Sequence, residues 1–272
     1  MSQFLKDTSV ISIASNSFGA TIQPGWRIGA VPNGGYVLSI IGRALSEALA
    51  HPDPVSINAF YLAPCELGDA LIEVTPLRET KNTSFASAAL SQDGQLRVQV
   101  TAAFGRHTRG EGPNWCAETP PQVRPFADTQ PAEVNALEIH QRVDMRMMQG
   151  QEAFMGQPSG SGEFVAWLQH RDETPIGAID LLMFADIMPP PIFAVYGPFG
   201  WVPTVELTVQ VRGHPAPGPL LVRVSSRYLS EGLIEADGEL WDCEGRIVAL
   251  SRQTMKVRLP QKGEASSALF TR

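Results

Sequence analysis

The chain has 272 residues, which is enough for two compact domains that each bury a core. Its 43% hydrophobic and 18% charged residues are typical of a globular protein and exclude an intrinsically disordered chain. The formal net charge of -7 and the pI near 5.3 provide no general basic surface for a phosphate backbone. We therefore expect no nucleic-acid partner, and an anionic substrate would need a local basic patch.

The cysteines and the first residues of the chain bear on its cellular setting. Cys65, Cys116 and Cys243 lie far apart and form no CxxC or Cys/His cluster, so neither a disulfide framework nor a zinc site is expected. Residues 1–7 lack a charged segment followed by an apolar one, and no apolar run approaches about 18 residues. The sequence predicts a cytoplasmic protein without membrane insertion, metal or cofactor.

In the first half of the chain, the hydrophobic pattern predicts a short strand at 18–22 and a helix at about 33–49. The helix begins with a turn signal, Asn33-Gly34-Gly35, that runs directly into apolar helical spacing. Asn33 can serve as the N-cap, and the two glycines permit many backbone conformations. Alternating residues then predict four long strands, near 55–62, 70–80, 83–92 and 95–105, with a hairpin signal at Asp93-Gly94.

The second half repeats this order of elements. Residues 107–135 are rich in proline, glycine and acidic residues without periodicity, which predicts a linker. A strand at 163–168 and a helix at about 175–187 follow, and prolines stop the helix. Four further strands are predicted near 202–212, 218–229, 232–242 and 246–258.

The two halves also share a sequence register, which indicates an internal repeat. Residues 55–61 and 205–211, which are 150 positions apart, both place apolar residues at odd positions. The same offset aligns Gly68 with Gly218. An offset of 151, as one inserted loop residue would cause, aligns the hairpin signals near residues 94 and 245.

Each half therefore reads as a long antiparallel sheet whose apolar face is covered by one central helix. This is the α+β layout of a hotdog fold, made twice in tandem. We predict an N-terminal hotdog at 1–106, a linker at 107–135 and a C-terminal hotdog at 136–272. The alternative, two unrelated α+β domains, would make the shared register a coincidence.

Several common catalytic sites are absent from the sequence. There is no GxSxG, no Walker A loop, no GxGxxG between strand and helix and no HExxH. Hydratases with the hotdog fold place an Asp and a His five positions apart around the helix start, and no such pair occurs here. The five histidines fall mostly at turns or segment ends, where we expect them to be solvated: His51, His107, His140, His170 and His214.

Three polar residues of the second half are candidates for a site. Asp186 falls in the last turn of the predicted helix, where the helix dipole disfavours a carboxylate by about 0.3–1 kcal/mol, so it is either functional or a solvated surface residue. Gln253 lies on a small or apolar strand face where its repeat partner is Ala102. A buried unpaired amide costs roughly 1–3 kcal/mol, so Gln253 needs a partner in a site or in the neighbouring backbone. Thr204 opens a strand, and periodicity alone gives it a structural role.

Four segments occur along the two halves in a fixed order: GWRIGAVPNGGY at 25–36, FYLAP at 60–64, ADIMPP at 185–190 and ALSRQ at 249–253. Together they resemble the acyl-CoA thioesterase family with a double hotdog fold, which includes the bacterial type II thioesterases. The resemblance covers about 15–105 and 160–258. It implies an acyl-CoA substrate and hydrolysis of its thioester.

The resemblance also implies roles for single residues. In that family an Asp, a Ser or Thr and a Gln hold and activate the water that attacks the thioester. The matching positions here are Asp186, Thr204 and Gln253. Because Ala102 stands where a first-half Gln would be, we expect one working site per chain.

The start of the first helix completes the predicted site. First-turn N–H groups lack partners within a helix, so they can donate to a developing oxyanion. We expect Asn33, Gly34, Gly35 and Tyr36 to form the oxyanion and substrate-binding end. Replacing Gly35 with Val should then lower turnover much more than stability.

Two other functions stay open from the sequence. A non-catalytic acyl-CoA or fatty-acid binding protein would keep the fold without turnover, and an acyltransferase would need an acceptor other than water. Exposed sheet faces are also compatible with a homodimer or a higher homo-oligomer.

Overall fold

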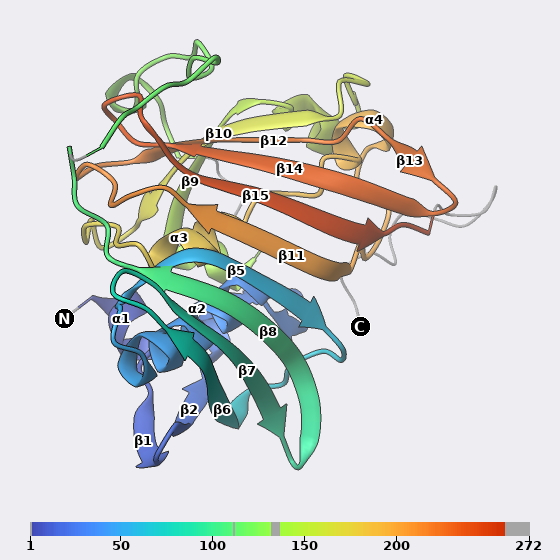
Figure 1. Cartoon of the computed structure of the whole chain (residues 1–272). Helices are drawn as coiled ribbons and strands as arrows, with labels where there is room; N and C mark the ends of the chain where they lie inside the picture. The colour runs from blue at the N-terminus through green and yellow to red at the C-terminus, as the bar shows by residue number, and fades with distance from the viewer. Residues whose placement is uncertain (1, 111, 132–136, 259–272) are drawn as a thin grey trace.

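The computed structural model describes residues 2–110, 112–131 and 137–258. Parts of the predicted linker (107–135) and of the predicted C-terminal unit (136–272) lie outside these ranges. In the described part, one long curved sheet wraps around two central helices, α2 (Gly34–Ala48) and α3 (Asp180–Phe184), as Figure 1 shows. The core lies between the sheet and these helices.

The sheet is continuous through both halves and has 13 strands in the part of the chain that the structure describes. The strand pairs that form it are antiparallel. The order is β1 (Ile11–Ala14), β2 (Ser17–Ile22), β6 (Gly68–Glu79), β7 (Ser84–Gln92), β8 (Gln95–Gly105), β5 (Asp53–Tyr61), β11 (Thr204–Val211), β15 (Ile247–Lys256), β14 (Leu233–Trp241), β12 (Leu220–Ser225), β10 (Glu163–His170) and β9 (Val143–Gln149), with β13 (Leu229–Ser230) paired to β14.

Strand order is symmetric about the contact between β5 and β11. Counted outward, β5, β8, β7, β6, β2 and β1 correspond to β11, β15, β14, β12, β10 and β9. At the centre Asn58 lies opposite Thr208, 150 positions away in the sequence, and its Nδ2 donates to the Thr208 Oγ1 at 2.9 Å. The sequence repeat thus folds into two hotdog units about a pseudo-two-fold axis, which confirms the predicted tandem hotdog fold.

Most predicted strands match the observed ones closely, but the one predicted near 218–229 is only Leu220–Ser225, and the helices match less well. The helix predicted at 175–187 is only five residues long, Asp180–Phe184, with single turns on either side of it. Prolines at 175 and 189–191 limit it, because proline cannot continue a helix interior. Short elements that the sequence did not predict are α1 (Gln3–Asp7), β1, β9, α4 (Phe193–Tyr196), the ribbon β3 (Arg27–Ile28) with β4 (Val31–Pro32), and the 3-10 helices η1 (Pro24–Trp26), η2 (Phe126–Asp128), η3 (Glu138–Gln141) and η4 (Gln151–Met155).

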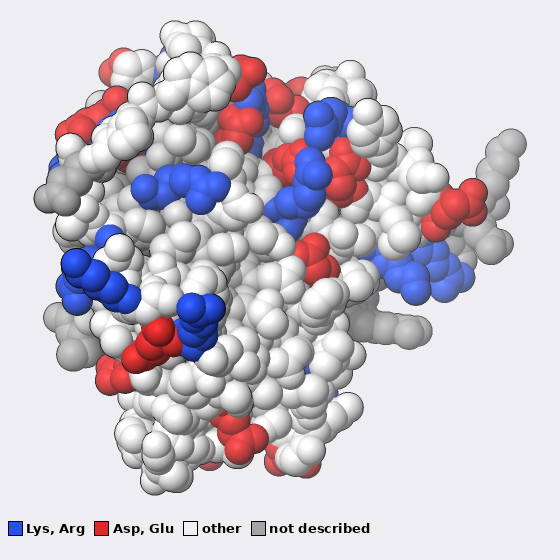
Figure 2. All heavy atoms as spheres, in the orientation of Figure 1, with Lys and Arg blue, Asp and Glu red and all other residues white. Residues whose placement is uncertain are grey.

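Charges of both signs are interspersed on the face of the molecule seen in Figure 2. Between neighbouring strands of the sheet, Arg252 forms an ion pair with Asp237, and Arg223 forms one with Glu239. Such exposed pairs contribute little to stability, typically below about 1 kcal/mol. The face seen in Figure 2 therefore presents charges of both signs rather than a continuous basic surface.

The two central helices meet through glycines. A Cβ built on Gly35 would lie 2.7 Å from the Leu182 carbonyl oxygen, and one on Gly42 would lie 2.9 Å from Leu182 Cδ1. The Ser39 hydroxyl, one turn after Gly35, donates to its own helix at the Gly35 carbonyl (2.9 Å) and reaches the Ile179 carbonyl at 3.3 Å. Backbone of α3 therefore occupies the space that larger residues on α2 would fill.

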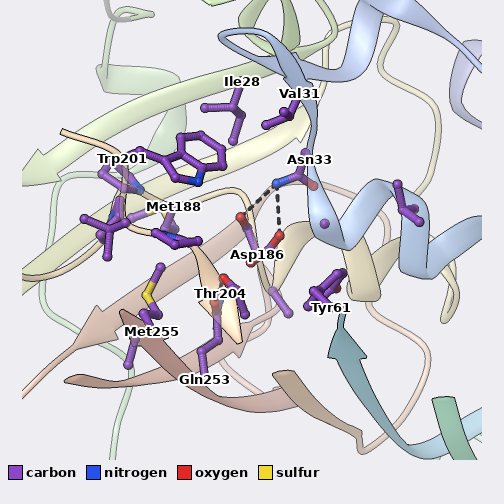
Figure 3. Close-up of a pocket in the computed structure, with 18 of the residues that line it drawn as sticks. Ile28, Val31, Asn33, Tyr61, Asp186, Met188, Trp201, Thr204, Gln253 and Met255 are labelled. Carbon is purple, nitrogen blue, oxygen red and sulfur yellow. Dashed lines mark hydrogen bonds between the residues drawn. The ribbon is translucent and has the colours of Figure 1, made fainter. Parts of the chain in front are cut away.

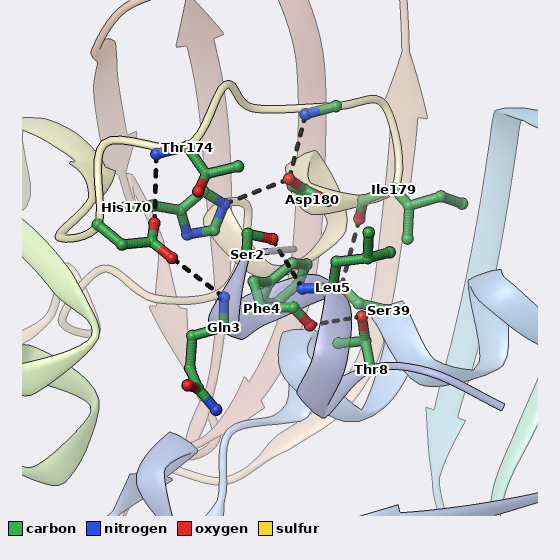
Figure 4. A network of polar contacts seen from close by, with 12 residues as sticks. Ser2, Gln3, Phe4, Leu5, Thr8, Ser39, His170, Thr174, Ile179 and Asp180 are labelled. Carbon is green, nitrogen blue, oxygen red and sulfur yellow. Dashed lines mark hydrogen bonds and ion pairs between the residues drawn. The ribbon is translucent and has the colours of Figure 1, made fainter.

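A cluster of polar and charged side chains ties the other ends of these helices together, and Figure 4 shows its His170 and Asp180. His170 Nε2 lies 3.2 Å from Asp180 Oδ2, and Arg43 of α2 donates to Asp180 Oδ1 at 3.0 Å. The side chain of His170 is 2% exposed. The expectation of a solvated histidine is therefore wrong for His170, because the carboxylate of Asp180, ten residues later, supplies its partner within the core.

We predict that Gly35→Ala destabilises the fold, since its Cβ would collide with backbone and not with a movable side-chain end. Overpacking of this kind costs typically about 1–3 kcal/mol, which chemical denaturation would measure. Gly213→Ala is the matched control, because nothing lies within 4 Å of a Cβ there and φ is not positive. Equal denaturation midpoints for the two variants would contradict this packing role. The close helix contact also overturns the expectation that Gly35→Val would spare stability.

Candidate active site

A cavity of about 280 Å³ opens between the two hotdog units, beside the end of α3 (Figure 3). Its polar side chains come from both halves of the chain, and most of its wall is apolar. The lining residues are Ile28, Val31, Pro32, Asn33, Gly34, Val37, Tyr61, Leu62, Ala63, Pro64, Cys65, Ala185, Asp186, Met188, Pro189, Pro190, Pro191, Phe193, Gly200, Trp201, Val202, Pro203, Thr204, Val224, Ala236, Gly238, Ser251, Gln253 and Met255.

The cavity exists because the two central helices differ in length. Helix α2 has 15 residues and covers the sheet of its own half, whereas α3 has 5. Beyond α3 the prolines 189–191 turn the chain into a cavity wall, so the facing strands β12, β14 and β15 stay uncovered there. Small residues of these strands, Ala236, Gly238 and Ser251, form part of the cavity lining and leave room for a ligand.

Asp186 sits where the two halves meet. Its Oδ2 accepts the Gly35 N–H at 2.7 Å and the Asn33 Nδ2 at 3.1 Å, and Asn33 Nδ2 also lies 3.0 Å from the Asp186 carbonyl oxygen. Asn33 Oδ1 in turn accepts the Tyr36 N–H at 2.9 Å, so Asn33 caps α2 while it holds Asp186. The positive end of the α2 dipole thus compensates the unfavourable place of this carboxylate after α3.

Burial raises the pKa of Asp186 to about 6, although hydrogen bonds from Gly35, Gln253 and Asn33 act to lower it. A carboxyl group with this pKa is ionised at neutral pH and is a stronger base than an exposed aspartate. Catalytic bases are most effective when their pKa lies near the working pH. Asp186 is therefore partly buried and basic, and it does not fit the alternative of a solvated surface residue.

Thr204 and Gln253 stand on the same side of the cavity, on the neighbouring strands β11 and β15. The Thr204 hydroxyl donates to Gln253 Oε1 at 2.8 Å. Because this bond occupies Oε1, the amide nitrogen of Gln253 is the group that can donate to the Asp186 carboxylate. The hydrogen bond from Gln253 acts to lower the pKa of Asp186. The partners of Gln253 are thus side chains lining the cavity rather than neighbouring backbone.

The predicted oxyanion residues divide into three groups. Asn33 and Gly34 line the cavity. Gly35 is not part of the lining, and its N–H donates to Asp186 Oδ2. Tyr36 points away, because its ring stacks on Trp26 at 5.4 Å and its hydroxyl donates to the Asp7 carbonyl at 2.8 Å. The structure therefore does not place Tyr36 against a substrate, and it gives the Gly35 N–H a different acceptor from the one expected.

Several lining residues were not singled out by the sequence as site residues, including Tyr61, Met188 and Trp201. Apolar and aromatic residues in loops and at strand ends carry no periodic signal that separates a pocket wall from a core. Within the described residues, no group of three or more His, Cys, Asp or Glu side chains is arranged to hold a metal ion. Among the same residues, no helix has the length and hydropathy needed to cross a membrane.

Comparisons with solved structures agree with this architecture. A Thermobifida fusca protein assigned as a thioesterase II is 26% identical, with a TM-score of 0.87 over 95% of this chain and 98% of its own. A hot dog fold protein of unknown function from Alicyclobacillus acidocaldarius has a TM-score of 0.85 at 21% identity, over 96% of this chain and all (100%) of its own. Acyl-CoA thioesterase II TesB2 from Mycobacterium marinum shares the fold at 15% identity, with a TM-score of 0.73 over 95% of this chain and 99% of its own.

Comparisons of the sequence identify a relative and two matching domain models. An uncharacterised protein of Mycobacterium tuberculosis is 24% identical over 274 aligned positions, which cover 90% of this chain and 92% of that protein. Residues 22–105 match the model of the acyl-CoA thioesterase N-terminal domain, and residues 117–257 match that of the C-terminal domain. Since the two matches follow the two hotdog units and span most of the sequence, the chain belongs to the acyl-CoA thioesterase family.

Proposed function

We propose that this protein hydrolyses an acyl-CoA thioester to the free acid and CoA, with Asp186 as the general base. The observation that carries the proposal is the position of the Asp186 carboxylate, which faces a cavity with apolar walls and is flanked by Gln253 and Thr204. Family membership supports thioesterase activity in general. The residue roles and the acyl-CoA substrate belong to the proposal.

The proposed reaction starts with a water beside Asp186. The carboxylate accepts a proton while the water oxygen bonds to the thioester carbon, whose C=O electron pair moves to the oxygen. Collapse of this oxyanion breaks the carbon–sulfur bond, and the proton held by Asp186 neutralises the leaving thiolate. The Thr204 hydroxyl keeps the Gln253 amide in a fixed orientation, and that amide orients the Asp186 carboxylate. The apolar wall of the cavity receives the acyl chain.

Cytoplasmic location, a role in lipid metabolism and a homodimer or higher homo-oligomer remain predictions. The same holds for the unit boundaries at 106 and 136. A binding protein without turnover and an acyltransferase are the competing functions, and the assay below separates them from a hydrolase.

We predict that the protein releases free thiol from at least one member of an acyl-CoA panel and that Asp186→Asn lowers this rate by about 10²–10⁴-fold, the usual range for a lost general base. Thiol release needs no added acceptor. Binding of acyl-CoA without release would identify a binding protein, and release only with an added alcohol or amine would identify a transferase. Undiminished release by Asp186→Asn would contradict the role of Asp186.

The same substitution should leave the fold intact and raise its stability at pH 7. Burial raises the pKa of Asp186 to about 6, so the folded state binds a proton more tightly than the unfolded chain, and the carboxyl group lowers stability as pH rises from about 4 to 6. Removing it should increase the free energy of unfolding by about 1–3 kcal/mol at pH 7 and by little at pH 4. Denaturation at both pH values measures this, and a loss of stability at pH 7 would contradict it.

The pH dependence of turnover follows from the same pKa. Because the ionised form is the base, kcat/KM should be level above about pH 6 and fall about tenfold per pH unit below it. A pH profile between 4.5 and 8, recorded over the range in which the protein stays folded, tests this. A low-pH limb centred near the ordinary aspartate value of about 4 would rule out a buried Asp186 as the base.

Thr204→Val should reduce kcat by about 10-fold or more with little loss of stability, because it frees Gln253 Oε1 and lets the amide rotate away from Asp186. Thr254→Val is the matched control, since Thr254 neighbours Gln253 on β15 and is absent from the cavity wall. Equal kcat values for the two valine variants would show that the Thr204 hydroxyl has no part in the reaction.

A further inference from the structure

The hydroxyl of Tyr61 stands out among the buried polar atoms of the described chain. Only two such side-chain atoms lack a hydrogen-bond partner there, Tyr61 Oη and Arg97 Nε. The guanidinium of Arg97 still donates through another nitrogen to Glu66 at 3.1 Å, whereas Tyr61 has no second polar atom. Leaving a buried hydroxyl unpaired costs about 1–3 kcal/mol, so its retention calls for a use.

Tyr61 is at the end of β5, and its side chain lines the cavity (Figure 3). The ring carbon that bears the hydroxyl, Cζ, is 3.0 Å from the point where a Cβ on Gly34 would sit. Asp186 Oδ2 is 3.0 Å from that same point. The tyrosine, the carboxylate and the first residue of α2 therefore share one corner of the cavity.

The hydroxyl nevertheless does not bond the carboxylate, whose Oδ2 is occupied by the Gly35 N–H and by Asn33 Nδ2. A second donor in this corner is also unused: the N–H of Gly34 has no acceptor in the described part of the chain, as expected for the first residue of a helix. Two donors without an acceptor thus belong to residues that line this corner of the cavity, next to Asp186.

Burial raises the pKa of Tyr61 well above its usual value, and the negative charge of Asp186 acts in the same direction. A raised pKa keeps the hydroxyl protonated near neutral pH, which suits a neutral hydrogen-bond donor. The repeat supports a special use at this position, because the corresponding residue of the other half, Val211, is apolar and buried.

We propose that the Tyr61 hydroxyl and the Gly34 N–H donate hydrogen bonds to the thioester carbonyl oxygen and stabilise the oxyanion that forms on it. This inference rests on the proposed hydrolysis. During the reaction the hydroxyl keeps its proton. The water oxygen bonds to the thioester carbon and gives one proton to Asp186, while the C=O electron pair moves to the carbonyl oxygen. The carbon–sulfur bond then breaks, and the proton on Asp186 goes to the leaving thiolate. Tyr61 is thereby a catalytic residue that touches the reacting oxygen.

Tyr36 provides a matched control, because it is a second buried tyrosine whose hydroxyl is fully used. It donates to the Asp7 carbonyl at 2.8 Å and accepts the Gln23 N–H at 3.0 Å, away from the cavity wall. Tyr61→Phe should lower kcat by about 10²-fold, the usual loss for one oxyanion donor, with a smaller change in KM and an unchanged or higher Tm. Tyr36→Phe should lower Tm and leave kcat within about twofold.

Kinetics and thermal unfolding of the wild type and both variants test this inference, on whichever acyl-CoA of the panel the wild type hydrolyses. Equal kcat for the wild type and Tyr61→Phe would overturn it while leaving the proposed hydrolysis intact. A shifted midpoint of the low-pH limb in Tyr61→Phe with an unchanged plateau would also overturn it, because the hydroxyl would then act on Asp186. No thiol release by the wild type would overturn the proposed function and this inference together.

Discussion

The hydrogen bond from the Gly35 N–H to the Asp186 carboxylate, 2.7 Å long, is the interaction on which the rest of the site depends. It joins the first turn of α2 in one hotdog unit to the end of α3 in the other, and it forms only because Gly35 lets the two helices approach to backbone contact. The same contact places Asn33 and Gly34 at the mouth of the cavity and turns the carboxylate toward Gln253. Gly35 therefore acts on the site through packing: it allows the close contact of the two helices, and that contact positions Asp186.

The site combines groups that cost stability. Asp186 is an ionised carboxylate in a largely apolar place, and Tyr61 carries a buried hydroxyl without a partner. Both costs are expected where a protein holds groups ready for a reaction rather than for its own folding. The ionic cluster of His170, Asp180 and Arg43 lies elsewhere along the same two helices and has its partners satisfied, so it fixes the helices without competing for the cavity. The two hotdog units are similar, but α3 is shorter than α2, and the cavity lies beside the end of α3.

Much of the fold could be predicted because strand alternation and the 150-residue offset are local patterns, and the offset is realised directly as the pairing of Asn58 with Thr208. The length of α3 could not, since residues around Leu182 are buried on every side and leave no amphipathic period to mark where the helix ends. Residue chemistry indicates Asp186 and Gln253, family resemblance adds Thr204, and the structure brings the three side chains together. Their partners, and the orientation of Tyr36 and Tyr61, depend on contacts between residues more than a hundred positions apart, which one sequence does not encode locally.

A single turnover in H₂¹⁸O, with enzyme in excess over an acyl-CoA that it hydrolyses, decides most directly whether Asp186 activates water or attacks the thioester itself. Mass spectrometry would follow the label in the released acid and in the peptide that contains Asp186. Direct attack by an activated water predicts one ¹⁸O in the acid and none in the peptide. Label in the Asp186 carboxyl group, together with an acid that carries none from the first turnover, would mean a covalent anhydride intermediate and would contradict the role of Asp186 as a general base.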